Sequence, residues 1–423
     1  MSKTYPKIGL LPLLVALALP AQAVDLTWSG FGTAGLAISD QPYKYQRFID
    51  DHGTLKRDSI LGAQLDARLS QNWSATLQVK LAPSDHSDTD LQASLPWAFV
   101  SWRPSDDWLI RAGKIRLPLM LNTENNDVGA TFDFARLPQE VYSIAPMTDI
   151  VGVGISKTWI GDNLDWILEA YTGKSKIYWR YYGRETTLPE GSPPGSWFLP
   201  INIKSTGLVM TVRNLDNTFR VGYHDVRASR DGARIGSPIA TQPIGGGRVV
   251  YFVDSAAGGS EEVIVPVFTL GASFQLPADI RLTGEYARMS VESVTEGLSR
   301  WGAYFAVSKR FGDWTTYAYL AKLKSTDSAL EKYRRFNGNV LPDNGPTAGL
   351  TNRQKLLADV VGPYDQSTSA LGTSYRLTSR SVIKAEISQV RTGDVSSFID
   401  APSGGDSAHK RIDVLSLSYS FIF

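Results

Sequence analysis

The sequence of 423 residues contains no cysteine, so the folded chain cannot depend on disulfide bonds. It has only four histidines, and it contains no Gly-x-Ser-x-Gly motif, no His-Glu-x-x-His motif and no cluster of metal ligands. These absences predict that the protein is not an enzyme and that it has no catalytic residues, no bound metal and no cofactor.

Net charge and long apolar runs are also scarce. The 43 Lys and Arg residues nearly balance 42 Asp and Glu residues, and the formal charge of +1 gives no reason to expect a nucleic-acid partner. After the first 23 residues, no stretch approaches the roughly 18 consecutive apolar residues of a membrane-spanning helix. The sequence therefore predicts no helical membrane span.

Residues 1–23 have the order of a secretory signal peptide. Lys3 and Lys7 precede an apolar run from Ile8 to Leu19, and Ala21-Gln22-Ala23 follows it. An anchoring helix is the alternative, but the run is shorter than the ~20 residues that a span needs. We expect an exported protein whose mature chain, residues 24–423, is a single domain, because no linker or low-complexity tract interrupts it.

The mature chain alternates between apolar and polar residues with a period of two, which is typical of β-strands. In the last nine residues, LSLSYSFIF, leucines and aromatics occupy every second position and mostly serines stand between them. Leu61 to Leu69 and Trp73 to Leu81 repeat this pattern on either side of Gln71-Asn72, and the two runs predict a β-hairpin.

Short and long polar connections alternate along the chain. Short turns are expected near residues 70–72, 104–107, 161–163, 214–217, 276–279, 311–313 and 378–380. Longer polar stretches lie near residues 40–57, 82–90, 114–149, 172–204, 227–261, 289–298, 323–365 and 391–410. Seven turns and eight loops join sixteen strands, and both termini then lie on the side of the short turns.

This sorting of the connections by length predicts an all-β fold, a transmembrane antiparallel β-barrel of sixteen strands with short periplasmic turns and long outer loops. A closed barrel pairs every backbone group, as hydrocarbon requires, and sixteen strands leave room for a water-filled interior. Trp73, Trp108 and Trp314 directly follow turn residues, where a membrane–water boundary favours an amphipathic ring.

Three segments resemble those of trimeric bacterial outer-membrane porins. They are the C-terminal pattern from Leu415 to Phe423, WSGFGTAGLA at 28–37, and WLIRAGKIRLPLMLNTENNDVG at 108–129. The first resembles the signal read by the barrel-assembly machinery, the second the first strand of general porins, and the third a strand and pore loop of the phosphate-selective porin superfamily. The resemblance implies a homotrimer in the outer membrane of a Gram-negative bacterium, in contact with lipid and lipopolysaccharide. Its assembly signal would comprise Leu417, Tyr419, Phe421 and Phe423.

The resemblance also implies that the third long loop, residues 114–149, folds into the barrel and narrows a pore. A constriction of this kind needs charges of both signs. The loop supplies Lys114, Arg116, Glu124, Asp127, Asp133 and Arg136. Basic residues on the polar phase of nearby strands could form a facing wall: Arg68, Lys80, Arg111, Arg220, Arg281 and Arg300.

The expected function is passive diffusion of small hydrophilic solutes and ions. Acids share the polar phase of the strands with the arginines, which favours a general or weakly selective channel: Asp66, Asp165, Glu169, Glu285 and Glu386. An anion- or phosphate-selective porin is one alternative. A sugar-selective porin is another, because Tyr317 and Tyr319 share an inward phase and aromatics crowd residues 178–182.

Three other kinds of barrel are alternatives to a porin. An outer-membrane phospholipase would need a Ser-His-Asn type of site, but the four histidines are scattered. A fatty-acid transporter would need an N-terminal plug, yet the first strand begins almost directly after Ala23. A non-conducting adhesin suits the long loops equally well and stays open.

Overall fold

The computed structural model describes residues 24–186, 194–291, 298–343 and 347–423. The expected signal peptide, residues 1–23, lies outside the described residues. In the part of the chain that is described, no helix is both long and apolar enough to cross a membrane.

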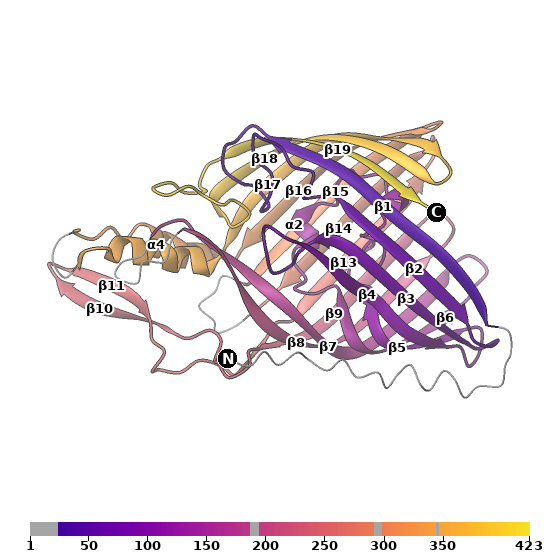
Figure 1. Cartoon of the computed structure of the whole chain (residues 1–423), viewed down its shortest axis with the longest axis horizontal. Coiled ribbons are helices and arrows are strands. Elements are labelled where there is room, and N and C mark those ends of the chain that lie inside the picture. The colour runs from indigo at the N-terminus through magenta and orange to yellow at the C-terminus, as the bar shows by residue number, and fades with distance from the viewer. Residues whose placement is uncertain (1–23, 187–193, 292–297, 344–346) are drawn as a thin grey trace.

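Sixteen antiparallel strands of the described chain form a closed barrel (Figure 1). Each strand pairs with the next, and β1 pairs with β19, so that no edge is left open. The predicted fold class is confirmed. The strands are β1 (Asp25–Ser39), β2 (Ile60–Arg68), β3 (Trp73–Pro83), β4 (Leu91–Trp102), β5 (Trp108–Arg116), β6 (Asp149–Trp159), β7 (Asp165–Gly183), β8 (Gly195–Arg213), β9 (Thr218–Ser229), β13 (Val267–Leu276), β14 (Ile280–Met289), β15 (Arg300–Phe311), β16 (Trp314–Ser325), β17 (Tyr364–Thr378), β18 (Ser381–Ser396) and β19 (Arg411–Ile422).

All seven predicted short turns join consecutive strands at one end of the barrel. The prediction of a loop over residues 172–204 is wrong in its bounds, because β7 and β8 stay paired as far as Gly183 and Gly195. The pairing continues because Ile201 and Ile203 keep the period of two and bury their side chains inside.

The end of the barrel opposite the short turns, called the outer end here, carries helices and a hairpin where the sequence predicts only loops. Two helices, α3 (Asp327–Asn337) and α4 (Leu350–Val361), lie beside a hairpin of β10 (Ile239–Gly245) and β11 (Arg248–Val253) (Figure 1). Tyr333 and Phe336 of α3 pack with Leu357 of α4, and Phe336 also contacts Tyr251 of β11. A short strand, β12 (Glu262–Ile264), extends the pairing of β9.

The barrel wall separates apolar from small polar side chains. In β19, Leu415, Leu417 and Tyr419 are exposed on the outer face, whereas the intervening serines are buried inside. At the short-turn end, aromatic rings form part of an outer belt: Trp73 stacks on Trp102 with ring centroids 5.7 Å apart. This arrangement is the one that a bilayer surrounding the barrel would favour.

Closure of the barrel depends on close contact between β1 and β19. Phe421 pairs with Gly32, and its ring covers the space where a side chain of Gly32 would lie. The ring of Phe423 covers Gly30 in the same way, while the two residues exchange backbone hydrogen bonds of 3.0 Å. An aromatic ring over a cross-strand glycine thus protects the backbone at the seam.

Candidate functional site

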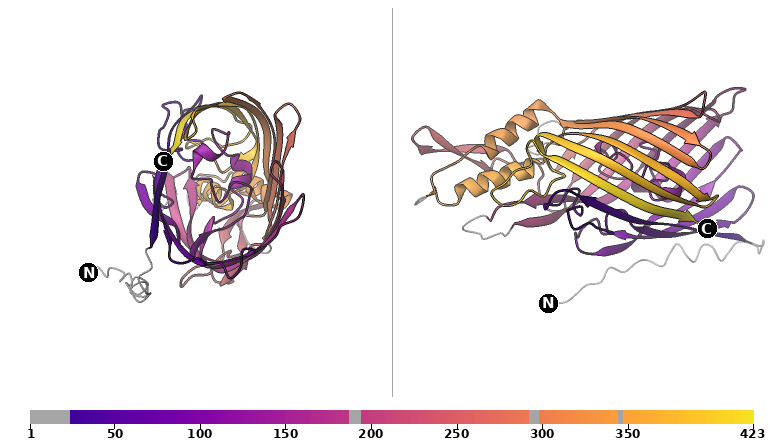
Figure 2. Two further views of the ribbon diagram at one scale, coloured as in Figure 1. Left: turned by 90° about the vertical axis from the view of Figure 1, so that its right-hand side faces the viewer. Right: turned by 90° about the horizontal axis from the view of Figure 1, so that it is seen from above.

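Residues 117–148, which connect β5 to β6, lie inside the barrel (Figure 2). This segment, called the inner loop here, includes a short 3-10 helix, η2 (Gly129–Thr131), and α2 (Gln139–Tyr142). Phe134 of the inner loop packs against Tyr304, Tyr317 and Tyr319, with ring centroids 5.0 to 6.1 Å apart. Tyr317 and Tyr319, on which the sugar-selective alternative rests, therefore hold the inner loop.

Buried carboxylates of the wall fix the apolar side of the inner loop. Glu285 accepts hydrogen bonds from the Leu121 amide at 2.7 Å and from the hydroxyls of Tyr142 and Tyr304 at 2.7 and 2.8 Å. Glu386 accepts one from Tyr317 at 2.8 Å. These acids satisfy donors that would otherwise be buried without a partner, so they act as anchors for the loop.

Two glycines allow the inner loop to approach the wall. A Cβ on Gly302 of β15 would overlap the carbonyl oxygen of Glu140 in α2. A Cβ on Gly129 in η2 would lie 2.5 Å from Ser420 Oγ and 2.6 Å from Thr33 Oγ1. Ser420 of β19 thus faces the inner loop at close range, and a larger side chain would not fit at this position.

The predicted charges of the inner loop do contact basic residues of the wall. Asp127 accepts hydrogen bonds from Lys80 of β3 at 2.9 and 3.0 Å and also pairs with Arg116. Glu124 lies 3.9 Å from Arg111 and 4.0 Å from Arg220. Three strands, β3, β5 and β9, therefore supply cations that face two acids of the inner loop.

The other predicted charges of this stretch find different partners. Arg136 pairs with Asp58 in the first outer loop. Asp133 accepts a hydrogen bond of 3.0 Å from Ser374 Oγ. Lys114 belongs to β5 and pairs with Asp149 of β6 at 3.2 Å.

Three predicted members of the basic wall lie elsewhere. Arg68 ends β2 beside a short turn. Arg281 donates to the carbonyl oxygen of Asp216 at 3.1 Å, also at the short-turn end. Arg300, at the other end of the barrel, donates to the carbonyl oxygen of Ser143 at 3.0 Å. A polar position in the alternating pattern of a strand predicts that the side chain points inward, but it does not predict how far along the barrel axis the side chain lies.

A cavity of about 490 Å³ lies between the inner loop and the wall formed by β1, β2, β3, β18 and β19. Five cations line it: Arg47, Arg57, Lys80, Arg136 and Lys384. Only two carboxylates do so, Asp58 and Asp127. A second cavity of about 350 Å³ lies toward the outer mouth and shares Gln46, Arg47 and Phe398 with the first.

Solved structures with the same architecture span almost the whole chain. OprB of Pseudomonas putida matches with a TM-score of 0.52 and 11% identity, covering 97% of this chain and 96% of that one. An anion-selective porin from Comamonas acidovorans matches with a TM-score of 0.51 and 10% identity, and the match covers 95% of this chain and 100% of that one. The outer-membrane channel DcaP of Acinetobacter baumannii matches with a TM-score of 0.50 and 11% identity, and the match covers 94% of this chain and 97% of that one.

The chain has the porin fold. No protein-family model matches the sequence, and no curated protein matches it either. Within this porin fold, sequence reasoning missed Arg47, Arg57 and Lys384. Lys384 occupies a polar position in the alternating pattern of β18 and donates to the carbonyl oxygens of Gly129 and Phe134. The alternating pattern could therefore have predicted that its side chain points inward. The two arginines belong to a loop without periodicity, where the sequence carries no such signal.

Proposed function

We propose that the protein is an outer-membrane porin that lets small hydrophilic solutes and ions diffuse passively through a water-filled channel. The cavity of about 490 Å³ beside the inner loop is the observation that supports this most directly, because it leaves space lined by charged side chains inside a closed barrel. The inner loop would then be the constriction, and the cavity toward the outer mouth would be the vestibule.

We further propose that the channel favours anions. The five cations against two carboxylates along the cavity leave an excess of positive charge, and charge clusters at a narrow point set ion preference. Asp127 is engaged by Lys80 and Arg116, and Asp58 by Arg136, so neither acid offsets Lys384 directly. Among the alternatives considered from the sequence, an anion-selective porin therefore has the better support.

The proposal includes the membrane setting and the partners. The exposed leucines and aromatics of the outer wall suit lipid and lipopolysaccharide, and the exposed Phe423 at the seam suits recognition by the barrel-assembly machinery. A homotrimer in the outer membrane of a Gram-negative bacterium remains part of the proposal. Removal of residues 1–23 as a signal peptide belongs to it as well.

Conductance of the purified protein in a planar bilayer tests the function. Steady conductance steps in potassium chloride are expected, and a gradient of the salt should give a reversal potential of the sign that chloride permeation produces. A reversal potential favouring potassium would remove the anion preference. A silent bilayer would instead favour the adhesin, for which the projecting helices α3 and α4 offer an exposed surface.

A further inference from the structure

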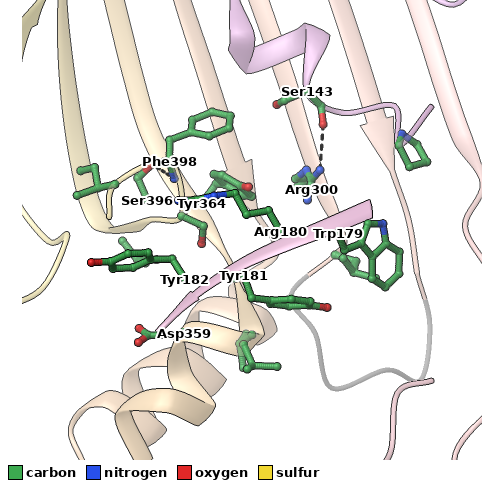
Figure 3. A pocket seen from close by; sticks show the side chains of 18 of the residues that line it. Ser143, Trp179, Arg180, Tyr181, Tyr182, Arg300, Asp359, Tyr364, Ser396 and Phe398 are labelled. Atoms are coloured by element: carbon green, nitrogen blue, oxygen red, sulfur yellow. Dashed lines mark hydrogen bonds between the residues drawn. The ribbon is translucent and has the colours of Figure 1, made fainter. Parts of the chain in front are cut away.

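The cavity toward the outer mouth has an apolar wall, which is unexpected inside a channel for hydrophilic solutes. It lies between the end of the inner loop, the outer parts of β7, β8 and β9, and α4 (Figure 3). Ile203, Val226, Ala228 and Val265 face it, and each is at most 2% exposed. These four side chains form an apolar backing to the cavity and have almost no accessible surface of their own.

The outer face of the same strands carries the charges instead. Arg227 is exposed and pairs with Asp225 at 3.2 Å and with Glu262 at 3.4 Å, and Lys204 pairs with Glu262 at 3.4 Å. The polarity of the wall is thus reversed relative to β19, where apolar side chains face outward. The apolar wall of the cavity does not result from contact with lipid.

Aromatic rings complete the lining. Trp179, Tyr364 and Phe398 face the cavity from three different parts of the chain (Figure 3). Tyr364 and Phe398 also contact each other, with ring centroids 4.8 Å apart. Such rings offer flat apolar surface to a planar molecule.

One cation of this lining, Arg300, has no carboxylate partner in the part of the chain that the structure describes. Arg47, Arg180 and Arg184 all form ion pairs, with Asp88, with Asp88 and Asp400, and with Asp359. Among the described residues, no carboxylate lies within ion-pair distance of Arg300.

The contacts of Arg300 leave part of its hydrogen-bonding capacity unused. It donates to the carbonyl oxygen of Ser143, its guanidinium lies 5.0 Å from the ring centroid of Tyr364, and its Nε is buried without an acceptor (Figure 3). A buried cation without a counter-charge is costly, and a carboxylate would remove that cost.

We propose that this cavity binds a small monocarboxylate with a planar apolar body, of about the size of benzoate. The proposal rests on the channel function proposed above and names a class of solute for it. The carboxylate would accept hydrogen bonds from Arg300, while the apolar body would lie against the partly exposed rings of Trp179, Tyr364 and Phe398. The volume of about 350 Å³ lies in the range of small-molecule sites. From here the solute would move toward the cation-lined cavity that shares Arg47 and Phe398.

Equilibrium binding to the purified full chain in detergent tests the site independently of conduction. Titration calorimetry should show saturable binding of benzoate and much weaker binding of benzamide, which has the same shape without the charge. Acetate, which has the charge without the apolar body, should also bind weakly. Equal binding of benzoate and benzamide, or of benzoate and acetate, would overturn the proposal.

Two arginine variants provide a matched comparison. Arg300→Gln should weaken benzoate binding about tenfold or more, because a hydrogen-bonded charge pair is lost. Arg300→Lys should weaken it less, because the charge remains. Arg281→Gln also removes an inward-facing arginine, but at the short-turn end, and should bind benzoate like the unchanged protein. Unchanged binding by Arg300→Gln, in protein that still shows a barrel circular-dichroism spectrum, would contradict the role of Arg300.

Phe398→Leu tests the apolar lining separately, because it removes an aromatic ring from the cavity and keeps an apolar side chain there. We expect weaker benzoate binding with the difference between benzoate and benzamide preserved, and tighter binding would contradict the apolar contact.

In bilayers, benzoate should also interrupt the chloride current. A silent bilayer together with normal benzoate binding would refute the channel and leave the site. A conducting channel without benzoate binding would refute the site alone.

Discussion

The residue type at each position of the barrel wall depends on the surroundings that the side chain faces. In β19 the outward positions carry leucines and aromatics, whereas the inward Ser420 is small where Gly129 of the inner loop packs against it. The contact leaves no space for a larger inward side chain at Ser420. The terminal pattern of the sequence therefore reflects both the outer wall and the filling of the interior.

Deletion of Phe423 should impair assembly. Phe423 exchanges two backbone hydrogen bonds with Gly30 and stacks on Phe421, so a chain ending at Ile422 loses part of the seam as well as an exposed aromatic. We expect much lower amounts of folded protein in outer-membrane fractions. Phe311→Ala is the matched control, since it removes a similarly exposed ring from the end of β15. Normal amounts of the shortened chain would show that the terminal aromatic is dispensable.

Glu124→Gln should increase the preference for anions. In the described chain, Glu124 is the one acid within ion-pair distance of Arg111 and of Arg220, so its neutralisation removes the nearest negative charge from two cations. One charge at ~8 Å in water contributes ~0.5 kcal/mol, which changes a permeability ratio about twofold. Reversal potentials in a salt gradient measure the ratio, with Asp216→Asn in an exposed turn as control. The change in the permeability ratio should be smaller in 1 M salt, where the Debye length is ~3 Å. An unaltered permeability ratio at low salt would place Glu124 away from the conduction path.

At the scale of elements, the sequence predicts strands and short turns well because each depends on neighbouring residues alone. The bounds of the outer connections depend on contacts made elsewhere, and α3 and α4 were not predicted. Leu330, Tyr333 and Phe336 follow a spacing of three that indicates a helix, yet the many charges between them read as a polar loop. Likewise, Asp127 and Lys80 could be expected near the pore, but their pairing depends on the path of the inner loop.

Gly302→Ala should displace α2 from β15. The added methyl group would overlap the carbonyl oxygen of Glu140, so the inner loop must move away from this wall. We expect an altered unitary conductance in bilayers together with lower thermal stability of the barrel. Gly284→Ala on the adjacent β14 is a matched control, because the nearest atom to its new methyl group would lie 3.4 Å away. An unchanged conductance for Gly302→Ala would mean that α2 does not determine the width of the passage.

The outer loops should be held together by Asp88 down to low pH. Burial alone would raise the pKa of the Asp88 carboxyl, but hydrogen bonds from Arg180 and Ser196 and the charge of Arg180 lower it to about 2. A carboxyl with a lowered pKa stabilises the fold above its unfolded pKa near 4, and loses this effect as the pH falls toward 2.

Asp88→Asn should therefore lower the melting temperature at pH 7, by an amount equivalent to at most about 2 kcal/mol. The difference from the unchanged protein should shrink between pH 4 and about 2. Melting followed by circular dichroism measures this, and Asp106→Asn in an exposed turn should show no such difference. A difference that persists at pH 2 would assign the stabilisation to something other than the charge of Asp88.

At the scale of the whole molecule, the two ends of the barrel differ in a way that predicts its direction in a membrane. One end has short turns and an aromatic belt that includes Trp73 and Trp314. The other end has the long connections, the helices α3 and α4, and strand extensions whose outer faces carry charges such as Arg227 and Glu262. Because long loops of bacterial barrels lie outside the cell and short turns lie in the periplasm, the helices should face the medium.

Single cysteines test this direction without interference, because the sequence contains no cysteine of its own. Val340, 72% exposed beside α3, and Leu215, fully exposed in a short turn, are apolar surface residues whose replacement should not disturb the fold. A maleimide on a polymer too large to pass through a sixteen-strand barrel should label Val340→Cys on intact cells. It should label Leu215→Cys only after the outer membrane is permeabilised, because that turn then lies in the periplasm. Labelling of Leu215→Cys on intact cells, with Val340→Cys protected, would reverse the orientation and would place the apolar cavity with Arg300 at the periplasmic mouth.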